Sequence, residues 1–170
     1  SQLRALRPDL DIRPLRGNIE TRMSYVERGE LDAIILAYAG LSRGGYADRA
    51  TEVFAPETLL PAPAQGALAV ECRAADAENV RALDSLVDEE ATACAAAERQ
   101  VLATLQAGCT APVAAYATRK ENGELTLRAG VFALDGATQL VETVTGTDAV
   151  EVGTRAAEAL VARGAKELME

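Results

Sequence analysis

One cysteine stands where a thiol could do chemistry. The segment "LQAGCTAPV" covers residues 105–113 and places Cys109 directly after an alanine-rich stretch of helical composition. At a loop tip, this thiol would be a nucleophile able to bond covalently to a ligand. A cysteine following Gly108 can equally be a small apolar residue that packs back on the last helical turn, where the helix end raises the thiol pKa. The spacing alone leaves both interpretations open.

Three arginines flank predicted elements at places suited to anion binding. Arg16 precedes a predicted helix, Arg22 lies in its first turn, and Arg43 follows a predicted strand in "GLSRGG". Helix amino ends present free backbone N–H groups, and open α/β sheets bind ligands beyond the carboxyl ends of their strands. The three guanidinium groups could therefore converge on one edge of the sheet, and arginine favours bidentate recognition of carboxylate or phosphate. The alternative is that they are solvated surface arginines.

Several other chemistries find no support in the residue types. The chain contains no histidine and only three widely spaced cysteines, so we expect neither a Ser-His-Asp triad, nor a metal site, nor a disulfide framework. No glycine-rich nucleotide-binding motif occurs. We predict that two of the cysteines are core residues, Cys72 and Cys94. We predict that four acids are helix-start or solvated charges: Asp88, Glu89, Glu90 and Glu98.

Composition indicates a globular chain. Its 170 residues are 49% apolar and carry a net charge of −9, which argues against nucleic acid as a partner. No apolar run is long enough to cross a bilayer and no signal peptide is evident, so we predict a cytoplasmic protein without a membrane partner. The first 50 residues hold eight arginines and no lysine.

The first third of the chain predicts a β-α-β-α unit that would position the arginines. Residues 10–15 suggest a short strand, and the following helix places Ile19, Met23 and Val26 on one face with Asn18 as its N-cap. The run "AIILAYAG", residues 33–40, is typical of a buried parallel strand ended by Gly40.

The remainder predicts a hinge and an α+β domain. Two prolines in "ETLLPAPAQ", residues 57–65, indicate a linker, and "GALAVECR", residues 66–73, a strand. Helices are expected at 77–86 and 89–106, the second capped by Asp88, with Gly108 as a left-handed residue after it. Strands follow at 113–118, 124–134 and 139–145, joined by the turns "ENGE" and "LDGA". A last helix from Asp148 is broken at Gly164.

Four segments in order resemble the porphobilinogen deaminase (hydroxymethylbilane synthase) family of tetrapyrrole and heme biosynthesis. They are "RPDLDIRPLRGNIETR" at 7–22, "DAIILAYAGLSR" at 32–43, "LPAPAQGALAVECR" at 60–73 and "AAERQVLATLQAGCTAPVAAYA" at 96–117. The cysteine turn departs slightly from the family pattern, with Ala107 before Gly108 and Ala111 before Pro112.

The resemblance implies roles for the residues singled out above. Family members are transferases that polymerise four porphobilinogen molecules into hydroxymethylbilane with loss of ammonia. A dipyrromethane cofactor is thioether-linked to the cysteine that corresponds to Cys109. Arginines corresponding to Arg16, Arg22 and Arg43 bind carboxylate groups of cofactor and substrate. The family aspartate that steadies developing positive charge lies in its first domain, so the resemblance implies no catalytic residue in this chain.

The resemblance also implies the domain organisation. The family has two domains of periplasmic-binding-like (type II) α/β architecture, followed by a small α+β domain with a three-stranded antiparallel sheet and flanking helices. We therefore expect residues 1–60 to be an incomplete second domain, 61–88 a hinge crossing towards the first domain, and 89–170 the complete cofactor-attachment domain. Alone, the chain should be inactive, and its exposed apolar surface should favour self-association, although the parent enzyme is expected to be a monomer.

Two other functions fit the residues. The chain could be a non-catalytic module that binds a small anion through Arg16, Arg22 and Arg43. Residues 89–170 could instead be an interaction domain in which Cys109 is inert.

Overall fold

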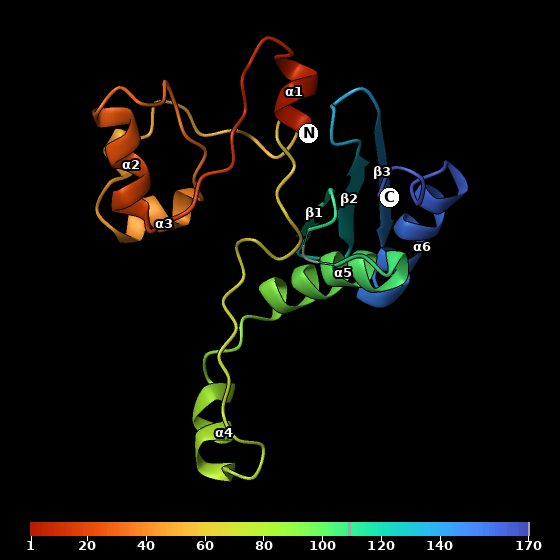
Figure 1. The fold of residues 1–170 in the computed structure, drawn as a ribbon. Helices are drawn as coiled ribbons and strands as arrows, with labels where there is room; N and C mark the ends of the chain where they lie inside the picture. Colours follow the sequence, from red (N-terminus) through yellow and green to blue (C-terminus); the bar gives the residue numbers. More distant parts are fainter. Residues whose placement is uncertain (109, 170) are drawn as a thin grey trace. The chain divides into compact units, whose positions relative to one another are not determined.

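The computed structural model describes residues 1–108 and 110–169, which form two compact units (Figure 1). One unit comprises residues 1–8 and 56–170, and the other residues 9–55. The chain thus leaves the larger unit after Pro8 and re-enters it at Pro56.

The larger unit is built on a three-stranded antiparallel sheet in the order β1-β2-β3. Its strands are β1 Val113–Arg119, β2 Leu125–Phe132 and β3 Gln139–Gly146. Tight turns join them, and each turn contains a glycine with positive φ, Gly123 and Gly136. This confirms the three predicted strands, with each boundary within two residues of its expected place.

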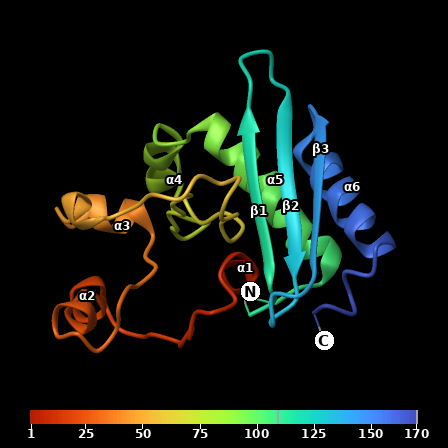
Figure 2. The ribbon, with the colours of Figure 1, turned by 90° about the horizontal axis from the view of Figure 1, so that it is seen from above.

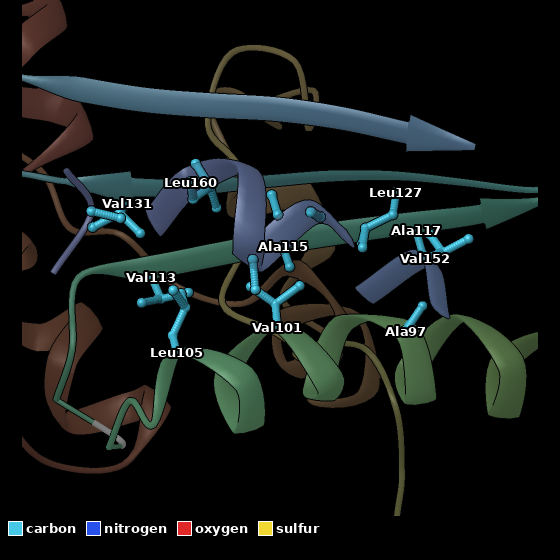
Figure 3. Close-up of a cluster of buried hydrophobic side chains, with 14 residues drawn as sticks. Ala97, Val101, Leu105, Val113, Ala115, Ala117, Leu127, Val131, Val152 and Leu160 are labelled. Atoms are coloured by element: carbon cyan, nitrogen blue, oxygen red, sulfur yellow. The ribbon is translucent and has the colours of Figure 1, made fainter. Parts of the chain in front are cut away.

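Two helices cover one face of this sheet, α5 Glu89–Leu105 and α6 Ala149–Ala162. Figure 3 shows Ala97, Val101 and Leu105 of α5, four residues apart, beside alternate residues of the strands. These periods of four and two residues are what a helix and a strand require to share one apolar core. Asp88 and Asp148 cap the two helices by accepting the N–H groups of Ala91 and Glu151.

Small residues bring α5 and α6 close together. A Cβ atom on Gly153 of α6 would lie 2.4 Å from the carbonyl oxygen of Ala97 in α5. Only glycine permits this approach, so α5 and α6 are in direct backbone contact at this point. After α6 the chain reverses through Gly164 (φ 89°) into turns, so the predicted resumption of the helix beyond Gly164 is wrong.

The other face of the sheet carries a smaller cluster made by Leu60, Ala114 and Phe132, with Val141 packed against it. The short helix α1 Gln2–Leu6 is held to the same unit at two points. The Gln2 side chain bonds the backbone of Leu60, and an Arg4 Nη group donates to the Leu134 carbonyl at 2.9 Å. Figure 2 shows α1 near the ends of the strands. Helix α4 Ala77–Asp84 has no buried residue.

The smaller unit consists of helices α2 Ile19–Glu27 and α3 Tyr38–Arg43 and the short 3₁₀ helix η1 Ala47–Arg49. A Cβ atom at Gly40 would lie 3.0 Å from Cδ1 of Ile19, so α3 packs on the first residue of α2. The Tyr46 hydroxyl donates to Glu20 at 2.9 Å, and Arg49 pairs with Glu27. Polar contacts therefore hold much of this unit together.

Three predicted strands are absent from the described residues. Segments 10–15, 33–40 and 66–73 pair with no other strand there, and Tyr38 begins a helix instead. Ile35 is 52% exposed and Leu68 75% exposed. Apolar patterning predicts which side chains seek burial, but a strand also needs a neighbour for its backbone hydrogen bonds. Cys72, predicted as a core residue of one of these strands, is exposed.

Candidate functional site

The loop between α5 and β1 carries the candidate nucleophile. Its entry is Gln106, which adopts the left-handed conformation (φ 55°, ψ 34°) that ends the helix, so the prediction that Gly108 does this is wrong. The Ala107 N–H donates to the Leu102 carbonyl at 3.0 Å, and the loop exit is held by Phe132 N–H donating to the Pro112 carbonyl at 3.0 Å. Both ends of the loop are thus fixed by backbone hydrogen bonds.

Cys109 itself lies outside the described residues, but its neighbours are informative. Gly108 and Thr110 are exposed, and nothing lies within 4 Å of a Cβ atom built on Gly108. An open hollow of about 450 Å³ adjoins the loop and is lined by residues 106–108, 110–112, Leu134, Leu168 and Met169. The described residues on either side of position 109 therefore border open space.

Two of the predicted arginines lie at the amino end of α2. Asn18 caps this helix as expected, with its Oδ1 accepting the Thr21 N–H at 2.7 Å. Arg22 folds back over the first turn, where its Nε donates to the Gly17 carbonyl at 2.7 Å. Arg16 is the neighbour of Gly17, is exposed, and has no ion-pair partner among the described residues. Cations here lie near the positive end of the helix dipole, which is electrostatically unfavourable. A bound anion would offset this repulsion.

Arg43 is placed differently from the prediction. It is the last residue of helix α3 and does not follow a strand. Because Gly40 of the same helix contacts Ile19, α3 lies against the first turn of α2. Arg43 lies one turn further along α3, is exposed, and makes no ion pair within the part of the chain that the structure describes. The structure therefore brings the helices that carry the arginines together.

Glu98 is buried, so the prediction that it is a helix-start or solvated charge is wrong. Its side chain in α5 is only 7% exposed and accepts the N–H groups of Ala64 at 2.6 Å and Ala117 at 2.7 Å. Burial raises the pKa of the Glu98 carboxyl, while the two backbone N–H groups act in the opposite direction. A signal existed, because position 98 continues the stripe of Ala97, Val101 and Leu105 that faces the sheet.

The remaining candidate groups give no further site. Cys94 is half-buried, and burial raises the pKa of its thiol, as expected for a cysteine packed against the core. Among the described residues no cluster of three potential metal ligands occurs. The described helices include none with the length and apolar character needed to span a membrane.

Comparison with known proteins identifies the family. The family description "Porphobilinogen deaminase, dipyromethane cofactor binding domain" matches residues 1–81, and "Porphobilinogen deaminase, C-terminal domain" matches residues 92–162. The first match contains the three arginines, and the second contains Cys109. The chain therefore belongs to the porphobilinogen deaminase family, which confirms the resemblance seen in its four motifs.

Individual relatives agree. The porphobilinogen deaminase of Corynebacterium glutamicum is 57% identical over 173 residues, and that of Corynebacterium aurimucosum 57% over 171 residues. The Mycobacterium tuberculosis protein of the same name is 49% identical over 179 residues. Each match covers 99% of this chain but only 57% or 58% of the relative. The chain thus spans somewhat more than half the length of the curated relatives it matches.

Proposed function

We propose that this chain is part of a porphobilinogen deaminase, also called hydroxymethylbilane synthase. This transferase joins four porphobilinogen molecules head to tail, releases ammonia at each addition, and frees hydroxymethylbilane by hydrolysis. The observation that carries the proposal is the ordered pair of family matches, which include the cysteine loop and all three arginines. The high identity to proteins of that name over nearly the whole chain supports it.

Cys109 is the proposed attachment point for the dipyrromethane cofactor, through a thioether from its sulfur. When bound, the cofactor supplies the pyrrole end to which substrate units are added. The fit rests on the loop: its flanking residues are exposed, space is open at Gly108, and a hollow lined in part by Leu134, Leu168 and Met169 adjoins it. Anchoring at both loop ends would hold the sulfur in a defined region while leaving room for the attached group.

Arg16, Arg22 and Arg43 are the proposed ligands for the acetate and propionate groups of cofactor and substrate. Each pyrrole unit brings two carboxylates, so a chain of units needs several fixed cations. Guanidinium groups meet carboxylates through paired parallel hydrogen bonds. Arg22 is suited to this role because its Nε is already bonded to Gly17, which orients the side chain and leaves its Nη groups for a ligand.

The parent protein's wider organisation belongs to the same proposal. Residues 1–60 would be part of a periplasmic-binding-like second domain, 61–88 a crossing segment, and 89–170 the cofactor-attachment domain. The aspartate that stabilises positive charge would come from a domain outside this chain. We therefore expect this chain alone to form no hydroxymethylbilane, and we expect the parent to be a cytoplasmic monomer.

Peptide mapping of the purified parent protein tests the proposal. We expect an intact-mass increment equal to two linked pyrrole units, located on the peptide that contains residue 109. The C109S variant should lack the increment, whereas the matched control C72S, at an exposed cysteine, should retain it. An increment that persists in C109S would refute the attachment site. Anion binding without any pigment in the parent protein would favour a plain binding module.

A further inference from the structure

The free edge of β1 is closed by side-chain and linker contacts. β1 is an outer strand of the sheet, so alternate N–H groups point away from β2. Two of these groups find acceptors outside the sheet. Ala115 donates to the Pro61 carbonyl at 3.0 Å, and Ala117 donates to Oε1 of Glu98 at 2.7 Å. The linker therefore lies along the strand edge, and Glu98 completes the contact.

Glu98 also holds the linker directly. Its second oxygen, Oε2, accepts the Ala64 N–H at 2.6 Å, so each carboxylate oxygen has its own backbone donor. Ala64 has φ 58°, a left-handed conformation that is uncommon for a residue with a Cβ atom. The hydrogen bond to Glu98 gives a physical reason why Ala64 keeps this conformation. Among the described residues, Glu98 makes no ion pair, so these two N–H groups are what compensate its burial.

A second contact fixes the start of the same linker. The Gln2 side chain donates from Nε2 to the Leu60 carbonyl at 2.8 Å and accepts the Leu60 N–H on Oε1 at 2.9 Å. Gln2 thus pairs with Leu60 as a neighbouring strand would. Residues 60–64 are thus held by three groups: the Gln2 side chain, the Ala115 N–H and the Glu98 carboxylate. Of these three groups, only the carboxylate is ionisable.

The position of Glu98 links this edge to the cysteine loop. α5 runs into the loop and β1 runs out of it. Glu98 lies about 10 Å before the end of α5, at 1.5 Å per residue, and Ala117 lies about 13 Å beyond the start of β1. The hydrogen bond between Glu98 and Ala117 therefore joins α5 to β1 at positions about equally far from the loop that connects them. A change in that bond would be transmitted to both ends of the loop.

We propose that Glu98 is a positioning residue, which ties α5, β1 and the linker together and thereby fixes the loop that carries Cys109. This inference rests on the proposed function, because it assigns Glu98 a part in presenting the attachment cysteine. Glutamine has nearly the same shape as glutamate but only one acceptor oxygen. In E98Q, the amide NH₂ would face either the Ala64 or the Ala117 N–H, so one backbone donor would lose its partner.

Hydrogen exchange on the 170-residue chain tests the proposal, with E90Q as a matched control on an exposed position of the same helix. In E98Q, we expect amides of the linker (60–66) and of the loop (106–112) to exchange roughly tenfold to a hundredfold faster, the equivalent of one hydrogen bond to a charged group. Exchange in the β2 peptide (125–132) should stay as in the native chain. Faster exchange in the linker alone, or equally in β2, would overturn the positioning role.

The alkylation rate of Cys109 provides a second measurement of loop position. We expect the alkylation rate of Cys109 by iodoacetamide, divided by that of the exposed Cys72, to change in E98Q and to stay unchanged in E90Q, as measured by peptide mass spectrometry on chain free of pigment. An unchanged ratio in E98Q would count against the proposal.

Two features keep the test decisive. If E98Q does not fold, hydrogen exchange on the native chain still tests the proposal. The Ala64 amide should then be protected from exchange although it lies in a linker. An unprotected Ala64 amide would overturn the proposal. None of these readings involves a pyrrole. Failure here would leave the proposed enzyme function standing, whereas absence of the cofactor from Cys109 in the parent protein would weaken that function alone.

Discussion

Replacing Gly153 by alanine should loosen the helix pair that supports the cysteine loop. The added methyl group would lie 2.4 Å from the Ala97 carbonyl oxygen and 2.6 Å from Cβ of Gln100, against an ordinary contact of at least 3.4 Å. The atom at 2.4 Å is backbone, so a rotamer change cannot remove the clash. α6 must instead move away from α5 by about 1 Å, judged from the same shortfall.

The size of the effect follows from two opposing contributions. Overpacking of this kind costs about 1–3 kcal/mol or more. Alanine also favours a helix over glycine by about 1 kcal/mol, which offsets part of that cost. Because the clash is with a backbone atom, the upper end of that cost applies, and we expect G153A to lower the free energy of unfolding by about 2 kcal/mol, which corresponds to a fall in melting temperature of roughly 4–8 °C for a chain of this size.

Urea unfolding followed by far-ultraviolet circular dichroism measures this change, since the chain has no tryptophan to report by fluorescence. G66A is a suitable control, because nothing lies within 4 Å of a Cβ atom at Gly66. Its stability should differ from the native chain by less than about 0.5 kcal/mol. If G153A were as stable as the native chain or more so, the close approach of α5 and α6 would be refuted.

Three further predictions concern the core, a titrating group and the arginines proposed as ligands. L127A should lower the free energy of unfolding by about 2–5 kcal/mol because it leaves a cavity at a fully buried site. The control L134A, at a 67% exposed position, should lower it much less. Equal effects of the two variants would contradict the assigned core. Burial raises the pKa of the Glu98 carboxyl, so the folded state holds that proton more tightly than the unfolded chain does. The free energy of unfolding of the native chain, relative to that of E98Q, should therefore be greatest below the usual glutamate pKa and should fall as the pH rises through the raised pKa. A rise in this difference over the same pH range would show that the two N–H donors lower the pKa of Glu98 more than burial raises it. In the parent enzyme, R22K should reduce kcat/KM at least about tenfold because lysine cannot pair bidentately, whereas R81K, on the exposed helix α4, should not; equal losses would argue against a ligand role for Arg22.

Much of the larger unit could be predicted because its signals are local. Helix α5 starts after Asp88 and α6 after Asp148, as their side chains and the apolar periods indicate, and the glycine turns mark the three strands. The strands also pair with strands adjacent to them in sequence, although α5 packs against the distant helix α6. The family could be recognised for a related reason, since its motifs are contiguous strings of residues.

Less of the smaller unit could be predicted, for the opposite reason. The apolar run at 33–40 is predicted to be a buried strand, but none of its residues is buried and Ile35 is 52% exposed, because a strand forms only where a second strand supplies hydrogen bonds. The described residues contain no such partner, and α3 begins at Tyr38 instead. The candidate arginines were selected from the sequence, yet the element that carries Arg43 was not the expected one.

The sequence by itself determined the chemistry available to this protein: a thiol after a helix, three arginines near helix ends, and motifs that place the chain in its family. Only the tertiary structure decided how Glu98 is used and that Gln106, not Gly108, is the left-handed residue after α5. A carboxylate on a helix is a surface charge unless backbone donors from distant segments meet it, and here Ala64 and Ala117 do so. Burial and hydrogen-bond partners are properties of the folded arrangement, so local patterns could not reveal them.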